Sequence, residues 1–230
     1  MRKVPMILIA VAFLFVATTG AFAEKTCCPK SQDGTIELFN GKCLQGWKCH
    51  NVDDVPMADV WSVEDGLLTT KGTPFGYLYT CKSFTNFKLT IVWRWKPDVD
   101  PSNCGVLLRM ADKPVSFLTT CVEAQLKHGS VGDLWAFYGA KCTADERVRT
   151  IKDHKALGDF CGVGKAKDAE KKPGEWNVYE ITVNQGDITV VLNGEEVNAA
   201  TGLDVKAGPV GLQSEGGPIQ FKRVALTPMK

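Results

Sequence analysis

The stretch FKLTIVWRW, residues 87–95, decides the fold class of this chain. Its large apolar side chains stand at every second position, at Phe87, Leu89, Ile91, Trp93 and Trp95. Successive side chains of a β-strand point to opposite faces, so a period of two predicts a strand with one buried face. The positions in between carry Lys88, Thr90, Val92 and Arg94, which suit the opposite face.

The same alternation recurs on both sides of this stretch, at residues 104–110, 122–126, 179–183, 188–192 and 219–226. Asp65-Gly66 stands between the short apolar runs 59–63 and 67–70, and Asp-Gly in such a place is a strong hairpin signal. Many short strands separated by turn residues predict an all-β sandwich of two antiparallel sheets.

Composition excludes several classes of protein. The chain has 230 residues, 44% of them hydrophobic and 23% charged, which is ordinary for a globular protein and unlike a disordered chain or a fibre. Lys and Arg number 27 against 26 Asp and Glu, so the basic excess typical of nucleic-acid-binding domains is missing. We find no internal repeat and expect a single all-β domain over residues 36–228 that binds no nucleic acid.

The amino terminus has the three parts of a secretory signal peptide. A basic start, Met1-Arg2-Lys3, precedes an apolar run over residues 4–16 and a small-residue cleavage site at Ala21-Phe22-Ala23. The alternative is a transmembrane anchor, which needs an apolar run of about 18 residues and is therefore disfavoured. We expect a signal peptide over residues 1–23, an N-terminal arm over residues 24–35, and a secreted or periplasmic protein of bacterial type with no membrane anchor after cleavage. The sequence says nothing of the oligomeric state.

Nine cysteines follow the predicted cleavage site, and disulfides persist in the oxidising compartments that exported proteins enter. The odd number leaves at least one thiol free or paired with another molecule. Cys27 and Cys28 are expected to pair with separate partners, and a bridge between Cys142 and Cys161 would restrain the charged segment between them. No Cys-x-x-Cys pair occurs, so neither a zinc ribbon nor a thioredoxin-type site is supported.

Residues 141–172 break the strand pattern, because Lys, Asp, Ala and Gly dominate them. We interpret this segment as a long surface loop or a short helix inserted between strands. Two readings remain open. It is either a solvated excursion or a wall or lid of a binding face, since long loops often carry function.

A series of short motifs in a fixed order resembles the 3-keto-disaccharide hydrolase domain family. The motifs are Leu38-Phe39-Asn40-Gly41-Lys42 with Gly46-Trp47, Trp61-Ser62-Val63-Glu64-Asp65-Gly66-Leu67, Asn103-Cys104-Gly105-Val106-Leu107-Leu108-Arg109, Glu123-Ala124-Gln125, Lys172-Pro173-Gly174-Glu175-Trp176-Asn177, Leu192-Asn193-Gly194 and Gly208-Pro209-Val210-Gly211-Leu212-Gln213. The resemblance implies a concanavalin-like jelly-roll sandwich, in agreement with the alternation.

The resemblance also implies a chemistry. Relatives cleave glycosides whose C3 hydroxyl has been oxidised to a ketone, which makes the hydrogen on C2 acidic. Removal of that proton gives an enolate, the group on C1 leaves by elimination, and water can then add. This route needs a base, a stabiliser of the enolate and an acid for the leaving oxygen. A divalent metal ion is a candidate stabiliser.

Two other functions remain open for a protein of this fold that binds a carbohydrate. A non-catalytic, lectin-like glycan-binding module is one, because a fold does not determine a function. An ordinary glycosidase with two carboxylates is the other, and it is the weakest, because Glu123 is the only well-placed carboxylate on a predicted strand.

Individual residues follow from these expectations. Glu123 is the first candidate for the acid or base, since Val122 and Ala124 point the other way and leave Glu123 and Gln125 on one polar face. Arg109 ends its strand on the face opposite Val106 and Leu108, and a guanidinium suits an enolate or a sugar oxygen. His128 is a candidate base or metal ligand beside Glu123. Each has a structural alternative: a sheet salt bridge for Glu123 and Arg109, and a loop histidine without a role for His128.

Two more residues are expected to bind substrate. Trp135 could stack on the apolar face of a sugar ring, and Arg94 is assigned to substrate with Gln125. Relatives usually carry an acidic residue at the position of Val92, which puts in doubt any mechanism that needs a carboxylate there. Trp61, Trp93 and Trp176 are expected in the core, and His50 and His154 are expected to have no role at the site.

Overall fold

A computed structural model describes residues 34–230 of the protein. The predicted signal peptide at residues 1–23 and the pair Cys27 and Cys28 lie outside the described residues, as does most of the predicted N-terminal arm. Among residues 34–230, no helix has both the length and the apolarity needed to cross a membrane.

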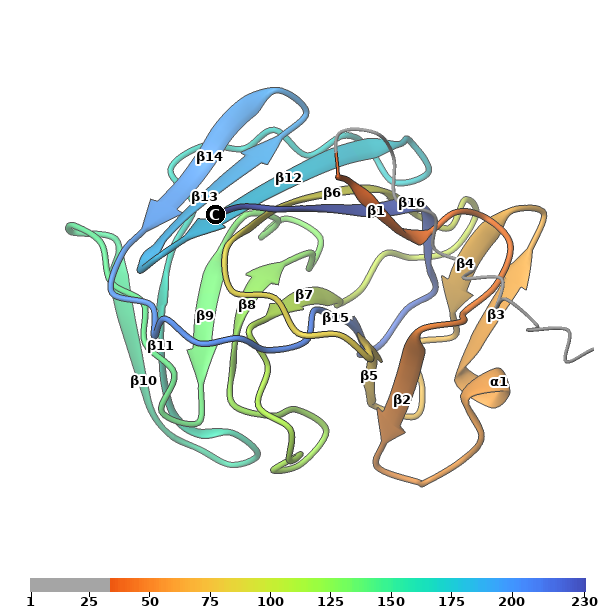
Figure 1. Cartoon of the computed structure of the whole chain (residues 1–230), viewed down its shortest axis with the longest axis horizontal. Helices are drawn as coiled ribbons and strands as arrows, with labels where there is room; N and C mark the ends of the chain where they lie inside the picture. Colours follow the sequence, from red (N-terminus) through yellow and green to blue (C-terminus); the bar gives the residue numbers. More distant parts are fainter. Residues whose placement is uncertain (1–33) are drawn as a thin grey trace, which may run out of the picture.

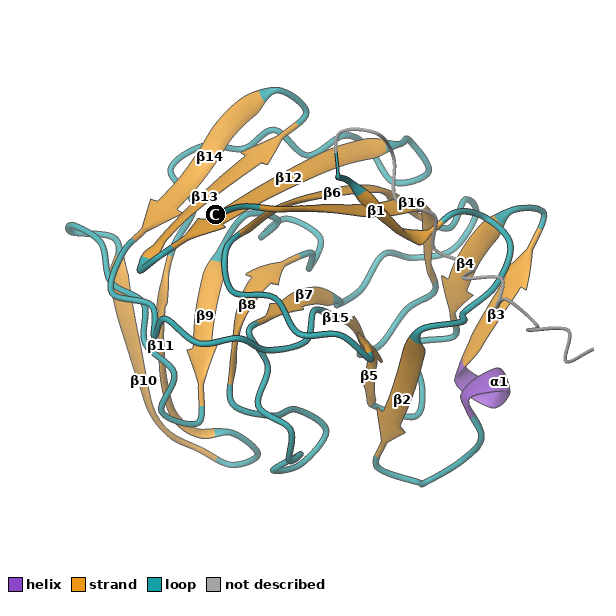
Figure 2. Ribbon diagram, in the orientation of Figure 1, coloured by secondary structure: helices purple, strands orange, loops and turns teal. Residues whose placement is uncertain are grey.

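Two antiparallel sheets of eight strands each make up the molecule (Figures 1 and 2). The first, called the β6 sheet here, has the order β14 (Glu195–Ala200), β13 (Asp187–Leu192), β12 (Asn177–Asn184), β6 (Phe87–Trp95), β16 (Ile219–Pro228), β4 (Leu67–Thr70) and β3 (Trp61–Glu64), with β1 (Ile36–Phe39) also paired to β16. The second, called the β8 sheet, has the order β10 (Val148–His154), β11 (Gly158–Val163), β9 (Leu134–Phe137), β8 (Cys121–Gln125), β7 (Gly105–Leu108), β15 (Gly211–Ser214), β5 (Gly76–Thr80) and β2 (Trp47–Asn51). A four-residue helix, α1 (Met57–Val60), precedes β3.

The predicted sandwich is confirmed, and its core lies between the two sheets. The five alternating apolar residues of β6 are at most 1% exposed. They pack in one cluster with Val106 and Leu108 of β7 and with Val122 and Ala124 of β8. The remaining residues of β7 and β8, including Leu107 and Glu123, therefore point to the other side of the β8 sheet, which we call its open face.

Turn residues act as the sequence predicts. Asp65 and Gly66 join β3 to β4 with φ angles of 51° and 76°, and Asn193 and Gly194 join β13 to β14 with φ angles of 54° and 87°. Both pairs have the positive φ values of a type I′ turn, which matches the twist of the strands that it connects.

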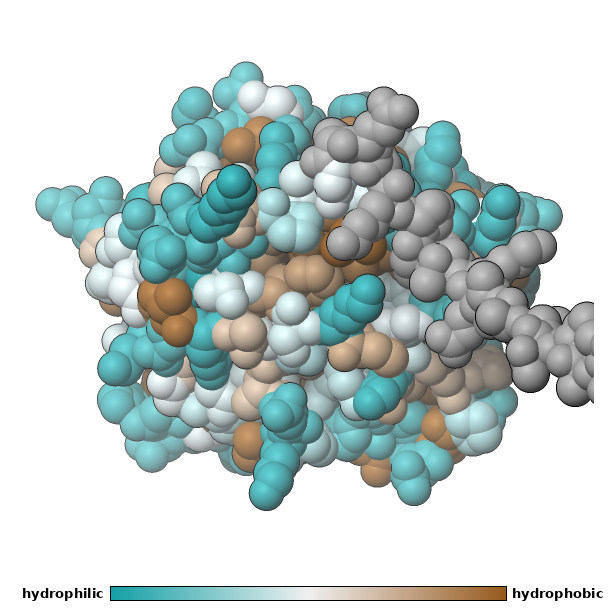
Figure 3. Space-filling view, in the orientation of Figure 1, coloured by the Kyte–Doolittle hydropathy of each residue, from teal (hydrophilic) through white to brown (hydrophobic). Residues whose placement is uncertain are grey.

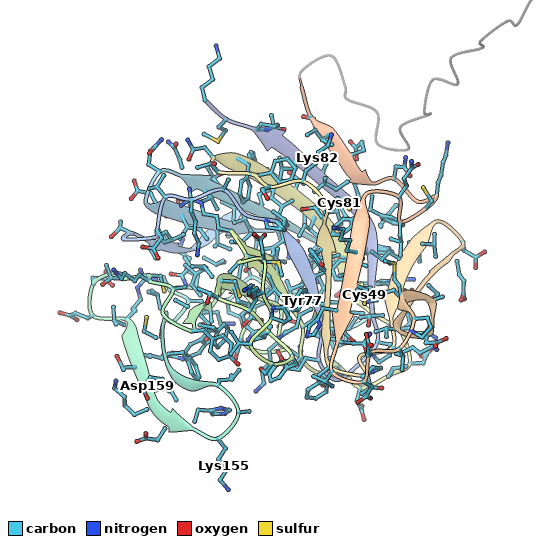
Figure 4. The ribbon with its side chains drawn as sticks, turned by 60° about the horizontal axis from the view of Figure 1, so that its bottom comes forward. Cys49, Tyr77, Cys81, Lys82, Lys155 and Asp159 are labelled. Carbon is cyan, nitrogen blue, oxygen red and sulfur yellow. The ribbon has the colours of Figure 1, made fainter. Side chains whose placement is uncertain are left out.

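The prediction of a loop or helix over residues 141–172 is wrong. This segment contains β10 and β11, a hairpin that extends the β8 sheet beyond β9. Figure 4 shows the hairpin, with Lys155 and Asp159 labelled, reaching away from the body of the sandwich. Its outer strand, Val-Arg-Thr-Ile-Lys-Asp-His, is almost wholly exposed. A charged edge strand of this kind buries no apolar face and so gives no alternating signal.

The predicted bridge between Cys142 and Cys161 is not formed. Cys161 lies on β11 opposite Ala136 and Thr150, and its Sγ contacts the carbonyl oxygen of Cys142 at 3.8 Å. Burial raises the pKa of the Cys142 thiol to about 12, and Cys161 beside it adds to the rise. Cys49 of β2 and Cys81 after β5 are also free thiols (Figure 4).

Tryptophan positions are partly as expected. Trp61 and Trp93 are buried in the core, as predicted, and Trp95 and Trp47 join them. Trp176 is not in the core. It is half-buried on the outside of the β6 sheet, where the Arg94 guanidinium lies 4.4 Å from its ring centre. The surface seen in Figure 3 is largely hydrophilic with scattered apolar residues, as is usual for a globular protein.

Candidate functional site

Strand register arranges the open face of the β8 sheet in three rows that run across β15, β7, β8, β9, β11 and β10. The polar row contains Gln213, Gly105, Gln125 and Asp133. The middle row contains Leu107, Glu123, Trp135, Gly162 and Arg149. The apolar row contains Cys121, Phe137, Phe160 and Ile151. The open face is therefore polar at one side and apolar at the other, and Glu123 lies between the two sides.

Glu123 is a carboxylic acid held out of water. The residue is 2% exposed, and its Oε1 atom has no hydrogen-bond partner among the described residues. Burial holds the pKa of this carboxyl well above its usual range, and the nearby Glu215 raises it further. An uncompensated charge at such a place is costly, so these surroundings favour the neutral, protonated form.

The main chain leaves a space for this carboxyl at Gly105. Leu107 is the residue directly opposite Glu123 on β7, and Gly105 lies two residues along on the same face. A Cβ atom at Gly105 would overlap the carboxyl group of Glu123. The side chain of Glu123 therefore leans over Gly105, toward the polar row.

Glu215 supplies a second carboxyl beside the first. It follows β15, and its backbone forms an isolated antiparallel β-bridge with Asn103, which precedes β7. Burial raises its pKa, while Asn103, Lys127 and Gln213 act in the opposite direction by stabilising its charged form. The carbonyl oxygens Asn103 Oδ1 and Gln213 Oε1 are buried and have no partner within residues 34–230. The two carboxyls thus stand in different environments, and Glu215 is the more easily ionised.

A pocket of about 370 Å³ lies over these rows. Its polar end is formed by Asn103, Glu123, Gln125, Lys127, Ser130, Asp133, Gln213 and Glu215. Its other end is formed by Leu118, Trp135, Phe137, Ile151, His154, Leu157 and Phe160, with Arg149 at the side. The β10–β11 hairpin supplies Arg149, Ile151, His154, Leu157 and Phe160. The sequence left open whether residues 141–172 are a solvated excursion or a wall of a binding face. The hairpin lies in the position of a wall.

Gln125 lies where the sequence places it, on the open face next to Glu123, and Trp135 lies on the same face, directly opposite Glu123 on β9. The Oε1 atom of Gln125 accepts hydrogen bonds from the N–H groups of Leu126 and Lys127, at 3.0 and 2.9 Å, which leaves its NH₂ group for a ligand. The ring of Trp135 lies over Gly162, where a Cβ atom would overlap it, and its edge packs on Phe160 at 5.5 Å between ring centres.

Arg109 does not join Glu123, contrary to expectation. The residue is 3% exposed, and its guanidinium donates to the carbonyl oxygens of Thr85 and Asp204 at 2.8 to 2.9 Å. The strand β7 ends at Leu108, and Arg109 has a φ of 48°, so its side chain leaves the alternation that predicts its direction. Arg109 therefore ties three segments together. Arg149, which donates to Asp133 at 3.5 Å, is the guanidinium that lines the pocket.

His128 and Arg94 also lie away from the pocket. The Nδ1 atom of His128 contacts Glu170 Oε1 at 2.9 Å, and the side chain is 43% exposed. Arg94 lies on the outside of the β6 sheet, where its Nε donates to Gln220 at 2.9 Å. The predicted group of Glu123, Arg109 and His128 is thus not brought together. His154, to which the sequence gives no role, does line the pocket.

A metal ion has no evident ligand set in the described part of the chain. No three His, Cys, Asp or Glu side chains of residues 34–230 come together in a way that could hold one. The carboxyls of Glu123 and Glu215 are thus joined by no third His, Cys, Asp or Glu ligand in the described part of the chain. The described site residues therefore do not fit the divalent ion that the sequence left open.

Solved structures share this sandwich. A putative glycosyl hydrolase from Parabacteroides distasonis matches with a TM-score of 0.60 and 22% identity, over 84% of this chain and 93% of that one. The carbohydrate-binding module CBM66 from Bacillus subtilis matches with a TM-score of 0.55 and 11% identity, over 79% of this chain and 95% of that one. At these identities the likeness shows the fold alone, which is the expected jelly roll.

Sequence comparison gives the family. A 3-keto-disaccharide hydrolase of Bacteroides thetaiotaomicron is 32% identical over 74 residues, which are 29% of this chain and 25% of that protein. The match thus spans a quarter of that curated relative. The family model of the 3-keto-alpha-glucoside-1,2-lyase-like domain matches residues 34–227, nearly all of the described chain. With this match, the chain belongs to the family of 3-keto-alpha-glucoside-1,2-lyase-like domains.

Proposed function

We propose that this protein cleaves the glycosidic bond of glycosides whose C3 hydroxyl has been oxidised to a ketone. The observation that carries the proposal is the carboxyl of Glu123, buried at the floor of the pocket with an unpartnered oxygen and with Glu215 beside it. Burial raises the pKa of both carboxyls, but only Glu215 has neighbours that stabilise its charged form, and two carboxyls in such different surroundings suit an acid and a base. Family membership supports the same chemistry.

Hydroxyl groups suit the polar end of the pocket. Asn103 Oδ1, Gln213 Oε1 and Glu123 Oε1 are acceptors without a donor in the described chain. A buried acceptor without a partner costs about 1–3 kcal/mol, which a ligand with several O–H donors recovers once small side-chain movements expose these atoms. The NH₂ group of Gln125 adds one donor of its own. A sugar ring provides hydroxyls of this kind, so we assign it to the polar row.

The assignment of roles follows from the different surroundings of the two carboxyls. Glu215, the more easily ionised carboxyl, takes the proton from C2 of the keto-sugar, and the electron pair of that bond forms the enolate. Glu123, the protonated carboxyl, gives its proton to the glycosidic oxygen as the bond from C1 to that oxygen breaks. Water then adds to C1 of the resulting enone, C2 regains a proton, and the net result is hydrolysis.

Lys127 is our candidate for the group that stabilises the enolate oxygen. It lines the pocket, its charge favours the ionised form of Glu215, and it forms no ion pair within the described residues. Arg149 is already engaged with Asp133. A positive charge near an oxygen that becomes negative lowers the barrier, and Lys127, an exposed residue, can bring its ammonium group to that oxygen.

The test compares a 3-keto-disaccharide with its unoxidised parent, each with and without EDTA. We expect cleavage of the 3-keto compound alone, unaffected by EDTA. In D₂O the recovered 3-keto-sugar should carry deuterium at C2 above the level in an enzyme-free control. Glu123→Gln and Glu215→Gln should each lower kcat by about 1000-fold while the fold is retained. Glu180→Gln is the matched control, because Glu180 pairs with Lys88 on the outside of the β6 sheet.

One other function has an observation in its favour. Glu215 gives the pocket the second carboxyl that an ordinary glycosidase needs, and that the sequence alone did not reveal. Cleavage of the unoxidised parent without deuterium at C2 would establish that function and refute ours. A non-catalytic glycan-binding module gains no support from a buried, unpartnered carboxyl. Binding of both sugars with no turnover would nevertheless restore it.

Export remains a prediction from residues 1–23. We propose that the protein acts in the periplasm or outside the cell, and sequencing the amino terminus of the protein from a bacterial host tests the cleavage after Ala23.

A further inference from the structure

The apolar row gives the pocket a second end whose chemistry differs from the first. Phe137 and Phe160 pack against each other at 5.0 Å between ring centres, and Ile151 lies directly opposite Phe160 on β10. Leu118 and Leu157 close the sides. These five side chains carry no hydrogen-bonding group, whereas the polar end offers amides and carboxyls.

Glu123 stands between the two ends. It lies in the middle row, with Gln125 in the polar row on one side and Cys121 beginning the apolar row on the other. Its carboxyl leans over Gly105 in the polar row. If Glu123 protonates the glycosidic oxygen, the sugar ring occupies the polar row, and the group on the other side of that oxygen, the aglycone, extends over the apolar row.

A hydroxylated aglycone fits this second end poorly. Each sugar hydroxyl that leaves water needs a replacement partner, and at this end of the pocket only His154, the Trp135 indole and Arg149 at the side carry polar groups. An apolar aglycone instead gains about 25 cal/mol for each Å² of surface removed from water. An aromatic ring gains further from edge-to-face contacts of the kind that Trp135 already makes with Phe160.

We propose that the preferred substrates are 3-keto-glycosides with an apolar, aromatic aglycone rather than a second sugar. This inference rests on the proposed function and names the substrate class of the same site. The Trp135 ring, over Gly162 and beside Glu123, lies at the boundary and would contact both parts of the substrate.

The test uses a benzyl 3-keto-glucoside and a 3-keto-disaccharide with the same oxidised ring and anomeric configuration, each prepared in both anomers. Both aglycones leave as alkyl alcohols, so the comparison measures binding of the aglycone more than leaving-group acidity. We expect the wild type to cleave the benzyl compound with a kcat/KM at least about 10-fold higher, the lower end of what a few apolar contacts provide.

Two variants connect the preference to the apolar row. Ile151→Thr, which also removes one methyl group, and Leu157→Gln place polar atoms at the apolar end of the pocket. Each should lower kcat/KM for the benzyl compound about 10-fold with little change for the disaccharide. Lys155→Gln is the control, because Lys155 is an exposed residue of the same hairpin and does not line the pocket (Figure 4).

Each outcome separates the two proposals. Equal cleavage of both compounds, or a benzyl preference that survives both variants, overturns the apolar-aglycone inference and leaves the proposed function intact. Cleavage of neither compound overturns the proposed function, and this inference with it.

Discussion

Gly105 determines where the Glu123 carboxyl lies, because any side chain at that position would occupy the same space. Gly105→Ala should displace the carboxyl toward the middle row. A shift of about 1 Å in a reacting group can lower a rate by about 100-fold, and we expect a loss of that size in kcat. Since the nearest atoms are the far end of a flexible side chain, the fold should be retained, as judged by thermal unfolding.

Gly186→Ala is the control for the Gly105 variant. A Cβ atom there meets nothing closer than 3.5 Å, and the residue lies in the turn between β12 and β13, on the other sheet. Its kcat should equal that of the wild type. Full activity in Gly105→Ala would show that the position of the carboxyl over Gly105 is not the one used in catalysis.

Arg109 illustrates a residue whose role is structural. Its guanidinium donates to the carbonyl oxygens of Thr85 and Asp204, and the short ammonium of a lysine cannot replace both contacts. Arg109→Lys should therefore reduce the free energy of unfolding by about 2–3 kcal/mol, which corresponds to a fall in Tm of about 5–10 °C. At 25 °C its kcat should stay within about twofold of the wild type. Loss of kcat at unchanged Tm would instead restore the catalytic role that the sequence suggested.

The site residues differ in how far the sequence reveals them. Glu123 and Gln125 lie inside a regular strand, so alternation alone gives the face that they share. Arg109 lies one residue beyond its strand and takes a positive φ, which alternation does not foresee. Glu215 likewise follows its strand, and only the pairing of β15 with β7 brings it beside Asn103. A single sequence does not reveal which strands, distant from one another along the chain, pair in the fold.

The β10–β11 hairpin is the element that completes the pocket. Thr150 and Cys161 are paired across it, so Asn-Gly can replace residues 151–160 and close the shorter hairpin with a type I′ turn. The variant loses Ile151, Leu157 and Phe160 and should fold, because the removed part is an edge with little buried surface. We expect kcat/KM for a benzyl 3-keto-glucoside to fall at least about 10-fold.

A methyl 3-keto-glucoside provides the comparison for the shortened hairpin. Its aglycone is too small to reach the apolar row, so its kcat/KM should stay within about threefold of the wild type. An equal loss for both compounds would mean that the hairpin supports the acid and base themselves rather than the aglycone.

The strands that bury the most apolar surface are the ones that the sequence reveals most clearly. β6 has a fully buried face and is evident from residues 87–95 alone. β10 buries almost nothing, and its charged residues resemble those of a surface loop. The core of the sandwich follows from the sequence, whereas the wall of the pocket does not, because a strand that faces water on both sides has no apolar period to detect.

The pocket and the core of the sandwich are two sides of one sheet, so the ionisation of Glu123 acts on the stability of the whole protein. The Tyr179 hydroxyl, from the β6 sheet, donates to the carbonyl oxygen of Gln125 at 3.4 Å. Burial raises the pKa of the Tyr179 hydroxyl and of the thiols of Cys104 and Cys121, and a charge on Glu123 raises these pKa values further, so this carboxyl lies close to the core.

This arrangement predicts how stability depends on pH. The pKa of Glu123 is raised in the folded protein, so above the ordinary glutamate value of about 4.3 the folded state holds a proton that the unfolded state releases. Stability should therefore fall as pH rises from about 4.3 toward the folded-state pKa, by up to about 1.4 kcal/mol per pH unit for this one group. Glu123→Gln cannot ionise and should lose none of this stability.

Urea unfolding of the wild type and of Glu123→Gln at pH 5, 6 and 7 tests this dependence. The variant should become progressively more stable relative to the wild type as pH rises, while Glu180→Gln, on the outside of the β6 sheet, shows what loss of a surface carboxyl does. Burial of Glu215 makes the same contribution to the pH dependence in both proteins. This contribution therefore cancels in the comparison, except where the two carboxyls interact. A constant difference from pH 5 to pH 7 would mean that Glu123 is ionised in the folded protein, and its role would then change from acid to base.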